Sequence, residues 1–145
     1  MTQHTPLSQD AALVVALAGT AMPFAHSAED EAERWLRAMR LHGQVGRCLQ
    51  ALGVGEAPLM TGSESGDDPH GTPPMGAEVL DDVTHRAGEL AAARKAETVG
   101  TADLLFAVME VYGKLFDRVL YTRGTSREEL TERLSGVSAA RPAGA

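Results

Sequence analysis

Apolar residues recur at intervals of three and four along most of the 145-residue chain. This spacing places them on one face of an α-helix, and the long alternation of Val, Ile and Thr that is typical of strands is absent. We therefore predict an all-α fold, a compact bundle of about six to seven helices built from two pseudo-repeats.

In the N-terminal half, the pattern predicts a helix from Leu7 to about Ala18, which Ser8 or Asp10 can cap. A second helix is expected to open at Ser27, because an acidic residue follows three positions later, as in a capping box. Trp35, Leu36 and Met39 then form an apolar stripe, which breaks at Gly43. The stripe resumes with Val45, Cys48, Leu49 and Leu52, and Gly53 is the expected C-terminal cap.

The C-terminal half predicts four further helices. The first is indicated by an apolar stripe from Glu78 to about Lys95, and the second by a cap at Thr101 after Gly100. The third is a short apolar run from Leu115 to Leu120, between Gly113 and Gly124. The fourth begins at a capping box formed by Thr125 and Glu128. Residues 60–76 lack apolar periodicity and are rich in Gly, Pro, Ser and Asp, which predicts a flexible linker. Residues 136–145 predict a disordered tail.

Two pairs of segments are similar across the halves. RCLQALGV from Arg47 matches RVLYTRGT from Arg118 at an offset of 71, and LSQDAALVVA from Leu7 matches GTADLLFAVM from Gly100 at an offset of 93. The difference of about 22 residues predicts an inserted helix in the first copy, over roughly residues 19–40. We therefore expect one structural domain, with a degenerate first repeat over 1–59 and a second repeat over 77–135.

Composition and charge narrow the classes of function. The net charge is −7 and no Lys/Arg cluster offsets it, so we expect no binding to nucleic acid. The single cysteine, Cys48, lies in an apolar stripe and is interpreted as a small buried hydrophobe. The apolar run over 11–18 is too short to cross a bilayer and follows a segment without Lys or Arg, so we expect no membrane segment, no signal peptide and a cytoplasmic protein.

The sequence contains none of the catalytic motifs that were considered. It lacks the Walker A pattern, the G-x-S-x-G elbow, H-E-x-x-H and C-x-x-C. The five histidines are scattered, and the acidic residues near His70 in the linker are interpreted as solvated rather than as a metal site. We therefore expect no enzymatic activity, no metal and no cofactor.

The segment VLDDVTHRAGELAAARKAETVGTADLLFAVMEVYGKLFDRVLYTRGTSREELTERL resembles one full repeat of the Clp N-terminal (Clp repeat) domain family. In that family a long helix leads to a Val-Gly-Thr-Glu-His-Leu-Leu turn, which here reads from Val99 to Leu105. Residues 47–54 match less well, and residues 1–40 only in part. The resemblance implies a stand-alone, helical, bacterial-type domain without the ATPase motor.

In that family the domain docks adaptors and protein substrates, and some members bind phosphorylated arginine through the acidic residue after Gly-Thr. This residue is replaced by Ala in the second copy here and by Gln in the first, while an Asp lies one place further on in both. Each Asp either takes over the role or acts as a helix-capping acid, and we favour capping. The candidate ligand-binding residues are Ser8, Gln9, Asp10, Thr101 and Asp103.

The resemblance favours a non-enzymatic, adaptor-like module for a protein or peptide partner, with a Clp-type ATPase or its substrate as candidates. Two alternatives stay open: sequestration or sensing of a small hydrophobic molecule or peptide, and homotypic association, including a homodimer. Because aromatic residues dominate interface hot spots, candidate anchors are Phe24, Trp35, Tyr112 and Tyr121. Trp35 lies on a helical stripe, where core packing is the more common role.

Overall fold

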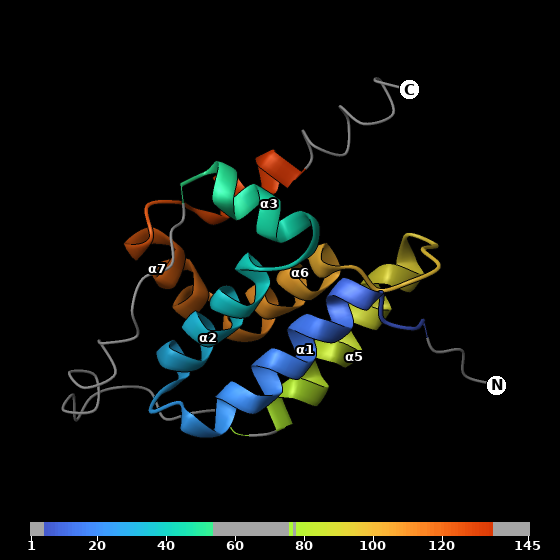
Figure 1. The fold of residues 1–145 in the computed structure, drawn as a ribbon, viewed down its shortest axis with the longest axis horizontal. Coiled ribbons are helices and arrows are strands. Elements are labelled where there is room, and N and C mark those ends of the chain that lie inside the picture. Colours follow the sequence, from blue (N-terminus) through green and yellow to red (C-terminus); the bar gives the residue numbers. More distant parts are fainter. Residues whose placement is uncertain (1–4, 54–75, 77, 135–145) are drawn as a thin grey trace.

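The computed structural model describes residues 5–53, 76 and 78–134, and its ordered elements are helices (Figure 1). They are α1 (Gln9–Ala21), the 3-10 helix η1 (Met22–Phe24), α2 (Ala28–Arg40), α3 (Gly43–Ala51), α5 (Glu78–Ala93), α6 (Thr101–Tyr112) and α7 (Lys114–Thr122), and residues 127–134 are also helical. Within the described ranges the β-type pairing is limited to an isolated bridge between Leu7 and Val99. The predicted all-α bundle is confirmed.

The two N-terminal caps form as predicted. The Ser8 hydroxyl accepts from the Ala11 N–H at 3.1 Å, and the Ser27 hydroxyl accepts from the Asp30 N–H at 3.1 Å. Each bond satisfies one backbone donor that the first turn of a helix leaves without a helical partner. α1 continues beyond its predicted end to Ala21, and the chain then turns through η1.

Two caps in the C-terminal half lie one residue away from their predicted positions. Gly100 is the N-cap of α6, because Thr101 is already helical and turns its hydroxyl to the Val45 N–H instead. Near residue 126, the Glu129 N–H donates to the Ser126 hydroxyl at 3.1 Å rather than to its neighbour. The predicted cap, Thr125, donates its hydroxyl to the carboxylate of Glu129.

The helices form two halves with matching contacts. α1 packs on α2 as α5 packs on α6, and α2 packs on α3 as α6 packs on α7. Between the halves, the contact of α2 with α7 corresponds to the contact of α6 with α3. The equivalent helices α2 and α6 contact each other, and so do α1 and α5. The contacts therefore pair α1, α2 and α3 with α5, α6 and α7 as two pseudo-symmetric three-helix units, although α1 also contacts α6, and Figure 1 shows α1 and α5 running side by side.

The pseudo-symmetry supports one predicted offset and changes the other. α3 (Gly43–Ala51) and α7 (Lys114–Thr122) have equal length and begin and end 71 residues apart. Contacts, however, match α2 rather than α1 to α6. The helix that we expected to be an insertion therefore occupies the place of the second helix of the first unit. α1 and α6 are both rich in Ala, Leu and Val, so their sequences are similar even though the two helices do not occupy equivalent places in the two units.

Both halves contribute to one core. Its largest fully buried side chains are Trp35, Phe116, Met39, Leu49, Leu104, Leu105, Leu120 and Leu130. The buried state predicted for Cys48 is confirmed, as is the core position that its stripe gave to Trp35. Most of the predicted linker (60–75) and the predicted tail (136–145) lie outside the described residues. None of the described helices is both long and apolar enough to cross a membrane.

Candidate functional site

The candidate ligand-binding residues of the two copies lie at one end of the bundle. The strand-like segments before α1 and α6 pair through the Ser8 N–H to Val99 O bond at 2.9 Å and the Val99 N–H to Pro6 O bond at 2.8 Å. Gly43 approaches the same place, since a Cβ there would lie 2.8 Å from the Thr101 hydroxyl oxygen and 3.3 Å from the Asp10 Cβ. The structure therefore brings the predicted set together.

Three members of this set already have structural roles. Ser8 caps α1, and the buried Thr101 hydroxyl accepts from the Val45 N–H at 3.4 Å. The buried Asp103 carboxylate accepts from the Gly100 N–H at 2.9 Å. It also binds the Arg94 guanidinium through both oxygens, with Nε at 2.9 Å from Oδ1. These contacts agree with the capping role that we favoured for Asp103.

The Arg94–Asp103 pair bears directly on guanidinium recognition. The side chain of Asp103 is 4% exposed, whereas that of Arg94 is 55% exposed and covers it. A bidentate guanidinium is the group that a carboxylate in this turn would be expected to capture. An external arginine would therefore have to displace Arg94 first. The two remaining candidates, Gln9 and Asp10, are exposed on the first turn of α1.

The four aromatic candidates divide into two groups. Trp35 is fully buried and Tyr112 is 4% exposed, so neither is available at the surface as an anchor. Both lie on the core-facing sides of α2 and α6, so they pack in the interior. Phe24 on η1 is 69% exposed and Tyr121 on α7 is 81% exposed, so these two remain available to a partner.

A buried carboxylate that the sequence reasoning missed joins the two halves. Glu31 is 1% exposed, and its Oε1 accepts from the Tyr112 hydroxyl at 3.2 Å while Oε2 accepts from the Gly76 N–H at 3.1 Å. Burial raises the pKa of the Tyr112 hydroxyl well above its usual range, and the Glu31 charge raises it further. The available signal was spacing, because Glu31 lies four residues before Trp35 on the same helical face.

The Trp35 Nε1–H adjoins this cluster without a matching acceptor. It lies near the Tyr112 hydroxyl and acts to lower the pKa of that group, but no described acceptor meets it with hydrogen-bond geometry. A cavity of about 350 Å³ lies beside the Glu31 carboxylate, lined by Gly19, Met22, Pro23, Ala25, Glu31, Gly76 and Leu80. The hydrogen bonds to Tyr112 and Gly76 give Glu31 a structural role, because they connect α2 to α6 and to the residue before α5.

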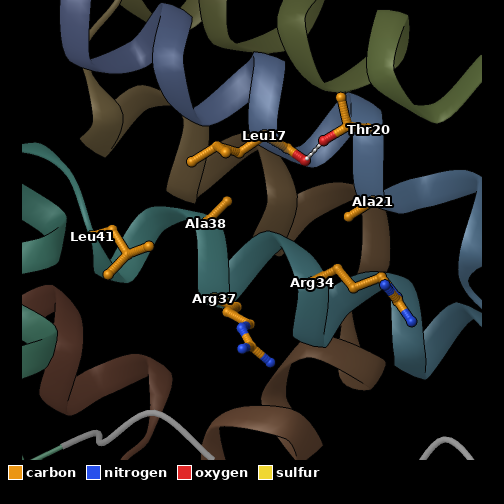
Figure 2. Close-up of a pocket in the computed structure, with 7 residues that line it drawn as sticks. All are labelled: Leu17, Thr20, Ala21, Arg34, Arg37, Ala38 and Leu41. Carbon is orange, nitrogen blue, oxygen red and sulfur yellow. Dashed lines mark hydrogen bonds between the residues drawn. The ribbon is translucent and has the colours of Figure 1, made fainter. Parts of the chain in front are cut away.

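A second cavity, of about 280 Å³, opens between α1 and α2 (Figure 2). Its lining is Leu17, Thr20, Ala21, Arg34, Arg37, Ala38 and Leu41. Figure 2 shows Leu17 and Ala21 on the side of α1 toward α2, while the Thr20 hydroxyl donates to Leu17 O and the guanidinium ends of Arg34 and Arg37 turn away from α1. The interior of this groove is therefore apolar, and its cationic groups lie at the rim.

Two leucines of the groove lining, and a third leucine next to them on α1, remain in contact with solvent. Leu17 is 39% exposed, Leu41 is 52% exposed, and Leu13, one turn before Leu17 on α1, is 43% exposed. We name these three residues the α1–α2 patch. α1 carries a single charged residue, Asp10, in its thirteen positions, although 23% of the whole chain is charged.

Potential metal ligands are not clustered in the described part of the chain. No three or more His, Cys, Asp or Glu side chains within it are placed to hold a metal ion. Burial raises the pKa of the Cys48 thiol, and Arg133 and Arg47 lower it by less. A thiol in this state is a poor nucleophile.

No protein-family model matches the chain, and no curated protein matches it in sequence. The function is therefore argued from the surface of the molecule.

Proposed function

We propose that this protein is a non-catalytic module that binds an apolar segment of a partner protein at the α1–α2 patch. The observation that carries the proposal is the groove between α1 and α2, which is apolar inside and bordered by half-exposed leucines. Burying a leucine fully is worth about 1.5–3 kcal/mol relative to leaving it exposed. A partner that covered the patch would recover part of this free energy at each position.

The size of the groove favours a peptide over a free small molecule. Its volume of about 280 Å³ lies just below the range of roughly 300–1,000 Å³ that is usual for small-molecule sites. One or two aliphatic side chains of an extended or helical segment would fill it. Arg34 at its rim is already paired with Asp30, with Nε 3.1 Å from Oδ1, so the groove recognises its ligand by apolar contacts.

The proposal includes membership of the Clp repeat family as a stand-alone, adaptor-like domain. The presence of two three-helix units in one core supports this, together with the Val-Gly-Thr turn before α6. A Clp-type ATPase or one of its substrates is the partner that the resemblance suggests. Phosphoarginine is left out of the proposal, because Arg94 already occupies the buried Asp103 carboxylate.

Selection from a displayed peptide library tests this function. We expect the protein to enrich peptides with two or more large aliphatic residues. Leu41→Asp should reduce their binding about tenfold or more, because it places a charge at the edge of the groove. Tyr121→Asp is the matched control, since it changes an exposed apolar residue on α7, and it should leave binding unchanged. Failure to enrich any peptide, or equal loss in both variants, would contradict the proposal.

A further inference from the structure

The cavity beside Glu31 is apolar except for one buried carboxylate. Its volume of about 350 Å³ lies within the range of roughly 300–1,000 Å³ that is usual for small-molecule sites. None of the other described lining residues has a side chain that ionises or donates a hydrogen bond: they are Gly19, Met22, Pro23, Ala25, Gly76 and Leu80. An apolar wall with one fixed polar group is the usual composition of a site that holds and orients a small ligand.

Burial shows which end of this cavity is open. Glu31 is 1% exposed and Met22 is also buried, so both lie at its inner end. Pro23 of η1 and Gly76 before α5 are exposed, so the cavity meets solvent beside these two residues. A ligand that enters there with its polar group first reaches the carboxylate, while the rest of the ligand stays between the apolar walls.

Two hydrogen bonds hold the Glu31 carboxylate in place without neutralising it. The donors are the Tyr112 hydroxyl at 3.2 Å and the Gly76 N–H at 3.1 Å, and both are uncharged groups. An ionised carboxylate can accept about four hydrogen bonds, so a donor from a ligand can join these two. A bond from a cationic donor is stronger than one from a neutral donor, and apolar surroundings strengthen the attraction between the charges.

These properties select one class of ligand. The carboxylate repels an anion, and a neutral apolar molecule would displace water from it without supplying a polar contact in return. We propose that the cavity binds a small organic cation, an ammonium group on a compact aliphatic or aromatic body. The ammonium group binds Glu31, and the body covers the apolar walls. The net charge of −7 adds a long-range attraction for such a ligand.

This site is separate from the groove of the proposed function. The two linings have no residue in common, although α1 contributes to both. A substitution in the cavity should therefore leave the binding of selected peptides unchanged, and Leu41→Asp in the groove should leave the binding of the cation unchanged. The two proposals can accordingly fail independently of each other.

Probes of similar shape and different charge test the preference for a cation. They are cyclohexylmethylamine, which is protonated at neutral pH as lysine is, the neutral cyclohexylmethanol and the anion cyclohexanecarboxylate. Each is titrated into the full chain up to about 20 mM, and backbone amide shifts are followed by nuclear magnetic resonance. We expect saturable shifts with the amine that include Gly19 and Gly76, and binding about tenfold weaker for the other two probes. No saturation with the amine, shifts confined to other residues, or equal affinity for all probes would overturn the proposal.

Two variants test the position of the bound amine. Glu31→Gln removes the charge and should weaken amine binding about tenfold or more. Gly19→Leu keeps Glu31 but narrows the cavity, because an added Cβ at Gly19 lies 3.6 Å from the Leu80 Cδ1, and it should also weaken binding. Gly88→Leu on α5 is the matched control, since nothing lies within 4 Å of its added Cβ, and it should bind the amine as the wild type does. Unchanged binding in either of the first two variants, or equal losses in the two glycine variants, would overturn the proposal.

Discussion

The hydroxyl of Tyr112 is buried and donates a hydrogen bond to Glu31, and this environment makes stability depend on pH. Burial, reinforced by the Glu31 charge, raises the pKa of Tyr112 above its ordinary value of about 10. In the unfolded chain the phenol ionises near pH 10, while in the folded chain it stays protonated. Its contribution is therefore complete below about pH 10 and is lost as pH rises through that value toward the folded pKa.

We expect the free energy of unfolding to fall above pH 10 more steeply in the wild type than in Tyr112→Phe. The difference in slope should approach about 1.4 kcal/mol per pH unit, the value for one proton. At neutral pH the same variant should cost about 1–3 kcal/mol, because the buried Glu31 Oε1 loses a donor. Urea titrations between about pH 8 and 11 measure both effects, and identical slopes in the two proteins would contradict the prediction.

Gly43 gives a second prediction at the scale of one residue. Its φ is +73°, and an added Cβ would lie 2.8 Å from both the Cγ2 and the Oγ1 of Thr101. Gly43→Ala should therefore destabilise the fold by more than the roughly 1 kcal/mol of left-handed strain alone.

Gly53 is the matched control for this substitution. Its φ of +79° is similar, but nothing lies within 4 Å of its added Cβ. Chemical denaturation of Gly53→Ala should show strain without the clash. If the two substitutions cost the same, the close contact between α3 and α6 is not a constraint.

Among the helices, the start of α6 depends on Asp103. This carboxylate caps the Gly100 N–H and pairs with Arg94 at the end of α5, so it joins two elements as well as capping one. Asp103→Asn keeps the shape but removes the charge, and it should cost about 1–3 kcal/mol. Hydrogen exchange of the first-turn amides of α6 should also become faster.

A surface pair provides the comparison for Asp103. Asp117 and Arg127 meet at 2.9 Å, but both side chains are substantially exposed. Asp117→Asn should change the free energy of unfolding by about 0.5 kcal/mol or less, because solvent screens the pair. Equal losses for the two aspartates would show that burial of Asp103 has no special weight.

The helices could be predicted from sequence where the signals are local. The serines before α1 and α2 cap as expected, because a cap depends on residues only three positions apart. The predicted cap of α6 was wrong by one residue, because the Thr101 hydroxyl accepts from the N–H of Val45, which is 56 residues away. Spacing along α2 places Glu31 on the buried face, but it does not reveal its partner Tyr112, which is 81 residues away.

Surface features, too, could be predicted from sequence only where they depend on residues close together in the chain. The candidate turn residues do meet at one end of the bundle, but the groove between α1 and α2 was not predicted. A uniformly apolar helix such as α1 indicates burial, and only the packed structure shows which face remains open. Phe24 and Tyr121 could not be separated from Trp35 and Tyr112 for the same reason.

For the molecule as a whole, the two halves should unfold together. α2 packs on α7 and α3 on α6, and the buried apolar residues of both halves form one cluster. Trp35 is the sole tryptophan of the chain and is fully buried, which makes its fluorescence a probe of the shared core. We expect thermal unfolding curves from this fluorescence and from far-ultraviolet circular dichroism to coincide. Separate midpoints would show that the halves fold independently.

The pseudo-symmetric arrangement has a consequence for cutting the chain. A break between α3 and α5 would give two fragments, each with one of the two helices, α2 and α6, that contact each other across the halves. Because each fragment presents the surface that the other needs, the pair should reassemble when mixed. If each fragment is fused to one part of a split reporter, the reporter signal should return only when the two fragments associate. Glu31→Lys in the first fragment should weaken this complementation, because it removes the acceptor of the Tyr112 hydroxyl.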